Sequence, residues 1–442
     1  MRQLMFALSL CAAGCFFEKE LPLSDGGAQN GDGLIDLHQG GSIALASCGY
    51  TVKTVDGASI PQPGANVLGA DPAPKMVHLN FGAQDASRNI AVVWRTNDNA
   101  TLATTVQFGT GGNTDKTQDG FTFVYDVAIG DPVRIHETHL CGLTPDTLYS
   151  YRVGGVGADG TQAFSPVYTF RTAPDRAASP SAEVVMLVLG DTRDGYSQWG
   201  AELTAAAAAN SPDVILFSGD AISLGPVQED WDTWFNAAES VLHSTPMIYA
   251  HGNHDVNSVN FFSQLAQPAD EQNFYVDYGP VHLAVANDTP QVPSDLQGAN
   301  TQLLDADLAA GAGAPWLMMM HHKPMWTAAS GPHPEDQLPV RMAFQPVVDK
   351  YKVDLVLAGH DHDYERTKPM RGTVTGQTAA DGTIYVVAGS AGAPLYPSGT
   401  NFWTATSEST FNYVVLRVHA GLLRATAFRG DGTMLDSFMI AK

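Results

Sequence analysis

The chain has 442 residues, which is too long for one compact core and suggests two or three domains. It is 44% apolar and 16% charged, as expected of a folded protein, and its 46 acidic and 23 basic residues give a formal net charge of −23. This charge disfavours nucleic acid, anionic membrane surfaces and large anionic polymers as partners or substrates, because no basic stripe is available to neutralise phosphates.

Residues 1–15 are predicted to form an export signal. Arg2 supplies a positive end, residues 4–10 an apolar core, and residues 12–14 a small-residue cleavage region. Cys15 directly follows that region, which resembles a bacterial lipoprotein cleavage box, so lipid anchoring at Cys15 and plain secretion both stay open. We therefore expect a periplasmic, outer-membrane or secreted protein whose only membrane contact would be that lipid. No later apolar run is long enough to span a membrane.

Residues 16–72 are rich in Gly, Asp, Ser and Pro and show little periodicity, which predicts a flexible linker. Residues 30–36 faintly resemble a calcium-binding loop, but both terminal ligand positions lack a carboxylate, so an ordinary polar linker is favoured. Cys48 and Cys141 are the two cysteines beyond the signal. An oxidising compartment would allow them to pair, although two unrelated thiols explain the sequence equally well.

Residues 73–174 consist of short alternating runs between turn signals, which is the pattern of a small antiparallel β-sandwich. The expected strands include residues 89–94, 104–108, 121–127, 148–153 and 167–171. The segment that ends at Tyr149 looks like the tyrosine corner of fibronectin type III domains. His136 and His139 are expected on the surface of a strand, without a functional role.

From residue 181 to 442 buried strands alternate with helices, which predicts an α/β domain with a largely parallel sheet and a β-rich C-terminal part. The strands are expected at 183–189, 213–217 and 353–357, and the helices at 199–210, 229–242, 303–310 and 336–351. The fold class is therefore multidomain β + α/β. An N-terminal antiparallel β-sandwich is followed by an α/β domain of packed mixed sheets flanked by helices.

Five apolar strands of this domain end in side chains that bind metal ions. The clusters are Asp191, Asp220, Asn253 with His254, His321 with His322, and His360 with His362. In an α/β sheet the loops at the carboxyl ends of the strands converge on one crevice, so we expect a single site. Glycines precede four of the five clusters and permit the sharp turns that aim the next side chain into the crevice.

The donor types indicate which ions such a site would hold. Mixed Asp, Asn and His ligands suit Fe, Mn or Zn, whereas calcium would want oxygen ligands only. Two such ions about 3.5–4 Å apart can generate hydroxide at neutral pH and clamp both oxygens of an in-line displacement. The sequence therefore predicts a hydrolytic centre with two metal ions.

The order of these clusters resembles that of a known family, the calcineurin-like metallophosphoesterases. The segment 359–366, Gly-His-Asp-His-Asp-Tyr-Glu-Arg, looks like the form typical of purple acid phosphatases, in which a β-sandwich also precedes the catalytic domain. The resemblance covers residues 73–442. It implies a phosphatase with two metal ions (Fe, Mn or Zn) that hydrolyses small phosphomonoesters by in-line attack of a metal-bridging hydroxide.

The resemblance also implies a role for each matching residue. Asp220 would bridge the two ions. The remaining ligands would be Asp191 and His362 at the first position, and Asn253, His322 and His360 at the second. Of the two neighbouring histidines, His322 is preferred to His321 because the family's ligand usually stands two residues before a proline, here Pro324.

Two histidines would contact the substrate rather than the metals. His254 would stabilise the transition state and help to protonate the leaving oxygen. His333 lies roughly where purple acid phosphatases have a further catalytic and substrate-binding histidine, although an ordinary loop histidine explains it equally well.

The sequence departs from the family at the first metal position. Ser223 stands where purple acid phosphatases have the tyrosine that colours their iron, and Arg193 stands where other branches have a histidine. We therefore expect no purple colour and a weaker or different first metal. Arg193 could bind a substrate phosphate oxygen, or it could form a surface salt bridge.

Other functions stay open. The same metal machinery serves phosphodiesterases and nucleotide phosphohydrolases, and the missing first-position ligand would also fit a binding protein with a decayed centre. A phosphomonoesterase is favoured because the other ligand positions and His254 are present. The expected partner is a small phosphate ester, and the sequence does not indicate an oligomeric state.

Overall fold

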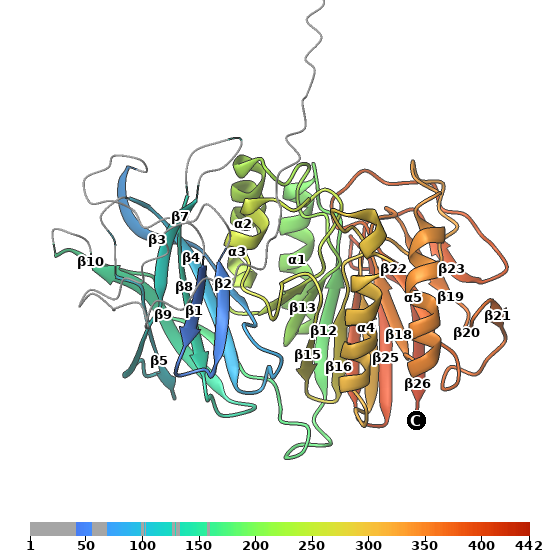
Figure 1. The fold of residues 1–442 in the computed structure, drawn as a ribbon, viewed down its shortest axis with the longest axis horizontal. Coiled ribbons are helices and arrows are strands. Elements are labelled where there is room, and N and C mark those ends of the chain that lie inside the picture. The colour runs from blue at the N-terminus through green and yellow to red at the C-terminus, as the bar shows by residue number, and fades with distance from the viewer. Residues whose placement is uncertain are drawn as a thin grey trace, which may run out of the picture.

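The computed structural model describes residues 41–54, 69–98, 101, 103–125, 129, 133–156 and 160–442. The export signal, Cys15 and the segment 30–36 lie outside the described residues, so their expected roles stay predictions. Figure 1 shows two bodies side by side, a β-sandwich in blue to green and an α/β domain in green to red. No helix within the described ranges is long and apolar enough to cross a membrane.

A β-hairpin lies within the region for which the sequence predicts a linker. Its strands are β1 (Gly41–Leu45) and β2 (Tyr50–Thr54). Cys48, in the turn between them, forms a disulfide with Cys141 of the sandwich, and Ile43 is buried in the sandwich's outer hydrophobic cluster. The expected linker is therefore wrong for this stretch, because a covalent bond and apolar packing hold the hairpin on the domain.

The β-sandwich has two antiparallel sheets, as the sequence predicts. The first has the order β3-β4-β8-β7: Ala70–Asn80, Asn89–Asp98, Val133–Cys141 and Phe121–Tyr125. The second has the order β10-β9-β5-β6, with β11 also paired to β9: Gln162–Phe164, Leu148–Val156, Thr105–Thr110, Lys116–Asp119 and Tyr168–Arg171. The Tyr149 hydroxyl accepts a hydrogen bond from the Thr144 backbone N–H at 2.9 Å, which is the contact of a tyrosine corner.

The two histidines that the sequence places on a strand surface are buried. The His136 ring stacks on Trp94 with 5.2 Å between the ring centroids. His139 lies 2.6 Å from a Glu137 carboxylate oxygen through Nε2 and 2.7 Å from the Tyr50 hydroxyl through Nδ1. The expectation was wrong because both faces of β8 are covered, one by the second sheet and the other by the hairpin.

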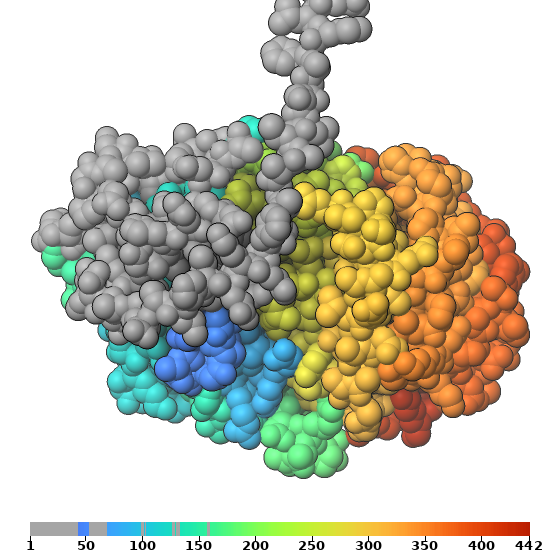
Figure 2. Space-filling model, in the orientation of Figure 1, coloured from blue at the N-terminus to red at the C-terminus, as the bar shows by residue number. Residues whose placement is uncertain are grey.

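The sandwich packs against the α/β domain through β3. The Asn80 amide donates a hydrogen bond to the Met247 carbonyl at 2.9 Å, and Nε2 of His78 lies 2.6 Å from the Gln264 carbonyl oxygen. One hydrophobic cluster runs from the sandwich into the α/β sheets. Figure 2 shows the two bodies in contact on this face. The sandwich therefore supports β14 (Met247–Tyr249) and α3 (Val259–Gln264), the two elements on either side of a polar loop.

The α/β domain contains two mixed sheets. The first has the order β14-β13-β12-β24-β25-β26, in which the other strands are Val214–Phe217, Val184–Leu189, Asn412–His419, Leu422–Arg429 and Met434–Ala441. The second has the order β15-β16-β17-β18-β22-β19-β23: Phe274–Tyr278, Val281–Val285, Trp316–Met320, Leu355–Ala358, Ile384–Ala388, Tyr364–Thr367 and Thr404–Glu408. A ribbon of β20 and β21 (Met370–Arg371 and Val374–Thr375) lies outside them.

Helices cover the outer face of each sheet, which gives four layers. On the first sheet lie α1 (Tyr196–Asn210) and α2 (Gln228–Leu242), and on the second lie α4 (Ala299–Ala310) and α5 (Gln337–Tyr351). A short 3-10 helix, Pro293–Asp295, precedes α4. In β12, Met186 and Val188 face the space between the sheets, whereas Leu187 and Leu189 face the helices. The continuous apolar runs therefore reflect strands that are buried on both faces.

The disulfide provides a test of how strongly the hairpin is held. Replacing both cysteines, Cys48→Ser with Cys141→Ser, should lower the free energy of unfolding by about 2–4 kcal/mol, because the bond closes a long loop in the unfolded chain. Urea unfolding of the wild type with and without reductant, beside the double variant, measures this. Equal midpoints in all three samples would show that the bond does not stabilise the domain.

Candidate metal centre

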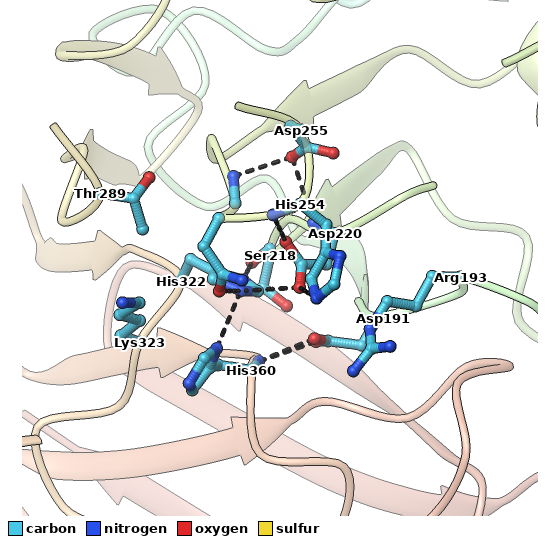
Figure 3. Close-up of polar contacts among 12 residues, drawn as sticks. Asp191, Arg193, Ser218, Asp220, His254, Asp255, Thr289, His322, Lys323 and His360 are labelled. Carbon is cyan, nitrogen blue, oxygen red and sulfur yellow. Dashed lines mark hydrogen bonds and ion pairs between the residues drawn. The ribbon is translucent and has the colours of Figure 1, made fainter. Parts of the chain in front are cut away.

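The five polar strand ends meet at one edge of the two sheets, and Figure 3 draws the part around Asp220. The residues follow β12 (Asp191), β13 (Asp220), β14 (Asn253 and His254), β17 (His322) and β18 (His360 and His362). Five of these side chains are buried: Asp191, Asp220, His322, His360 and His362. Because these polar side chains are shielded from solvent, they need hydrogen-bond partners or a bound ion.

Four donor atoms surround the second metal position. Nε2 of His322 lies 3.3 Å from Oδ2 of Asp220, 3.1 Å from Oδ1 of Asn253 and 3.3 Å from Nδ1 of His360. Ligand atoms bonded at about 2.1 Å to a tetrahedral ion lie about 3.4 Å from one another. The spacing and the mixed nitrogen and oxygen donors therefore fit a transition-metal ion.

The first metal position has fewer donors. Oδ1 of Asp191 lies 3.6 Å from Nε2 of His362. The sequence predicts that Asp220 bridges the first and second positions. The Ser223 hydroxyl donates a hydrogen bond to Oδ1 of Asp194 at 2.5 Å. Among the described residues the guanidinium of Arg193 is next to His362, with 3.5 Å between Nη2 and Nε2.

Backbone carbonyls set the orientation of two imidazoles. Nδ1 of His322 lies 2.8 Å from the Ser218 carbonyl, and Nδ1 of His362 lies 2.6 Å from the Pro394 carbonyl. Because a carbonyl oxygen only accepts hydrogen bonds, each Nδ1 carries the proton and each Nε2 faces the site. His360 is turned the other way, with Nε2 3.4 Å from an Asp336 carboxylate oxygen and Nδ1 towards the second position.

The buried carboxylates and imidazoles have perturbed pKa values. Burial opposes ionisation of Asp220, but the charge and hydrogen bond of His322 outweigh it and hold the Asp220 pKa below its usual range. Burial likewise opposes protonation of His322, yet Asp220 raises the His322 pKa to about 10. At His362, burial and the nearby Arg193 charge dominate and lower the pKa to about 3. Without metal, Asp220 and His322 therefore form a buried ion pair.

The backbone conformations at the site show a different role for the glycines than the sharp turns that the sequence predicts. The residues with left-handed backbone are the expected ligands themselves, Asp191 (φ 53°), Asp220 (φ 56°) and His360 (φ 67°), and only one of the four preceding glycines has a positive φ. A Cβ on Gly252 would collide with the Asp220 carboxylate, and one on Gly359 with the Asp191 carboxylate. These glycines therefore make room for a neighbouring ligand rather than form the turn.

Asp255 joins two of the ligand loops. Its buried Oδ2 accepts hydrogen bonds from the backbone N–H groups of Asp220 (3.2 Å) and Gly252 (2.8 Å). Its Oδ1 accepts one from the Tyr249 hydroxyl at 2.9 Å. The carboxylate therefore holds the loops after β13 and β14 in register. The sequence shows Asp255 in the same cluster as Asn253, but it does not show this positioning contact.

The other histidines occupy different surroundings. The His254 side chain is 31% exposed, and its Nε2 lies 3.9 Å from Oδ2 of Asp220 while its Nδ1 donates to the Ser223 carbonyl at 2.7 Å. His321 points away from the donors and contacts Oδ2 of Asp288 at 2.8 Å. His333 is 57% exposed, and its ring centroid lies 6.5 Å from that of His360. The structure thus places His254 at the open side of the donors and His333 farther out.

These positions separate the roles of the two neighbouring histidines. His322→Ala should abolish binding of the ion at the second position, because it removes one of the four donor atoms that surround it. His321→Ala should keep the ion. It should lower the free energy of unfolding by about 1–3 kcal/mol, because the buried Asp288 carboxylate loses its contact with His321. Metal content by mass spectrometry and urea unfolding test both variants. The opposite pattern would mean that His321 is the ligand.

The ion pair also predicts how metal affinity depends on pH. Because the His322 pKa is raised to about 10, its ring is protonated near neutral pH and must lose that proton to bind a metal ion. The affinity of the second position for Zn²⁺ should therefore rise about tenfold per pH unit from about pH 6 to about pH 10, and then level off. Chelator competition at a series of pH values measures this. An affinity independent of pH would contradict the ion pair.

Comparisons with known proteins identify both domains. Residues 74–172 match the model of the purple acid phosphatase N-terminal domain, and residues 185–364 match that of the calcineurin-like phosphoesterases. The chain has a similar fold to a purple acid phosphatase from yellow lupin seeds, with a TM-score of 0.74, 22% identity and coverage of 84% of this chain and 74% of the lupin chain. These matches confirm the fold and the domain order.

Relatives in Arabidopsis thaliana are similar over most of the chain. Probable inactive purple acid phosphatase 1 is 26% identical over 361 residues, which are 71% of this chain and 58% of the relative. Purple acid phosphatase 21 is also 26% identical, over 67% of each chain. The chain thus spans little more than half the length of the first relative. Together with the fold and the donor geometry, these matches show that the chain belongs to the calcineurin-like phosphoesterases, in its purple acid phosphatase-like branch.

Proposed function

We propose that the protein is an exported, metal-dependent hydrolase of small phosphomonoesters. The observation that supports this most directly is the donor cluster of the second position, where Asp220, Asn253 and His360 each lie within 3.3 Å of Nε2 of His322. Such a buried set of oxygen and nitrogen donors suits Fe, Mn or Zn, and the purple acid phosphatase family uses two ions at this place. Asp191 and His362 would hold the other ion.

The protein's own side chains would perform two further tasks. When bound, the ions would supply Lewis acidity and a hydroxide nucleophile at neutral pH. His254 donates through Nδ1 to the Ser223 carbonyl, so its Nε2 faces the partly open side of the site, where it can deliver a proton to the leaving oxygen. Arg193 can bind a non-bridging phosphoryl oxygen.

The charges around the site favour a small substrate. Among the described residues next to the expected ligands, Lys323 is paired with Asp336 at 2.8 Å, and Asp336 also contacts His360. Glu335 lies 3.3 Å from the exposed His333, the residue we expect to contact the substrate. A substrate with several negative charges would meet these carboxylates, whereas a single phosphoryl group would reach the site with less repulsion. A phosphodiester is the alternative substrate.

Hydrolysis of a matched pair of chromogenic esters tests this proposal. The protein is stripped of metal, reloaded with Fe, Mn or Zn, and assayed with a phosphomonoester and the corresponding diester. We expect the monoester to be the better substrate and His254→Ala to lower kcat by about 10²–10⁴, the usual contribution of a general acid. His243→Ala, in a histidine that precedes β14 and stacks on Tyr168 of the sandwich, is the matched control.

Three outcomes would change the proposal. Preference for the diester would overturn the monoester assignment. Unchanged turnover in His254→Ala would remove His254 from the mechanism. No turnover of either ester in any metal-loaded sample, with folding intact by circular dichroism, would favour a binding protein with a decayed centre.

A further inference from the structure

The loop after β22 reaches the first metal position, although the sequence shows no cluster of polar residues there. Its Pro394 carbonyl accepts the Nδ1–H of His362 at 2.6 Å, and the Tyr396 backbone N–H donates to the His362 carbonyl at 2.9 Å. The Tyr396 ring stacks on the imidazole of His362, with 4.0 Å between centroids and 17° between planes. The loop thus fixes one face of a first-position ligand.

The same tyrosine holds Arg193. Nη2 of Arg193 donates to the Tyr396 hydroxyl at 3.1 Å and lies 3.5 Å from Nε2 of His362. In Figure 3 the Arg193 side chain lies beside Asp191, on the opposite side of the drawn site from Lys323. Nε of Arg193 is buried and has no hydrogen-bond partner among the described residues. The guanidinium therefore lies at the first position with a donor still free.

In this arrangement Arg193 and a metal ion compete for the same nitrogen of His362. Because Nδ1 of His362 is engaged by Pro394, Nε2 carries the only lone pair that His362 can offer to an ion. That is the atom beside which the guanidinium lies. A permanently charged group at this distance also repels a second cation in a poorly hydrated site.

We propose that Arg193, held in place by Tyr396, supplies the positive charge of the first position, so that the chain binds one metal ion tightly and a second only weakly. The inference rests on the proposed function and narrows it. The tight ion lies at the second position, with Asp220, Asn253, His322 and His360 as donors. The guanidinium binds a phosphoryl oxygen in place of the weakly held ion.

Zinc binding to the metal-stripped protein tests this inference without any turnover. Isothermal titration should show one tight event per chain in the wild type and a second, much weaker one. Arg193→Met keeps the length of the side chain but removes its charge and donors, and should tighten the second event on the order of tenfold or more. Arg193→His adds an imidazole donor and should bring the stoichiometry to about two tight ions.

Two further variants complete the experiment. Tyr396→Phe keeps the ring on His362 but releases the guanidinium, so the second event should tighten less than in Arg193→Met. Arg88→Met, in an exposed arginine of the sandwich, is the matched control and should behave as the wild type. Inorganic phosphate should bind the one-zinc wild type at least about tenfold more tightly than one-zinc Arg193→Met.

Each contrary result removes a defined part of the inference. Two equally tight events in the wild type, or an unchanged second event in Arg193→Met, would overturn it. If Tyr396→Phe binds zinc as the wild type does, Tyr396 does not hold Arg193 at the first position. Retention of the tight event in each variant shows that the fold is intact. If the zinc-loaded wild type hydrolyses no ester but shows the expected zinc binding, the proposed function is refuted and the metal assignment stands.

Discussion

The arrangement of the site depends on keeping the Asp220 carboxylate ionised while it is buried. A lone buried carboxylate would take up a proton, because burial disfavours its charge. Here the His254 backbone N–H donates to Oδ1 at 2.8 Å, and His322 lies 3.3 Å from Oδ2. These contacts come from the loops after β14 and β17, which belong to different sheets. The two sheets must therefore pack with their carboxyl ends together before Asp220 can hold a metal ion.

The same requirement explains where the chain is strained. Left-handed backbone at a non-glycine residue costs about 1–3 kcal/mol, and it occurs at three of the expected ligands, Asp191, Asp220 and His360. The Asp255 carboxylate holds two of the ligand loops, and glycines such as Gly252 let neighbouring ligands approach. The four-layer core stabilises this geometry, and the sandwich adds support beneath β14. Rigid strands thus position side chains that the loops alone could not hold.

Much of the fold and of the site could be predicted from the sequence, because local patterns determine them. Apolar runs such as the one ending at Leu189 give the buried strands, and polar residues directly after them give the convergent site. Contacts between distant segments could not be predicted in this way. Tyr396 reaches His362 from a loop without a polar pattern, His139 is covered by a hairpin tied down through a disulfide, and Asp336 meets His360 only in the folded chain.

A metal ion among the donors that follow β13, β14, β17 and β18 is the feature on which the proposed chemistry depends. Anomalous X-ray diffraction from crystals grown with zinc, recorded on both sides of the zinc absorption edge, tests this most directly. We expect the strongest anomalous peak within bonding distance of Asp220, Asn253, His322 and His360, at about 2.0–2.2 Å from each donor atom. A zinc-loaded protein with no peak there, or with its strongest peak elsewhere, would show that these side chains do not form the metal site.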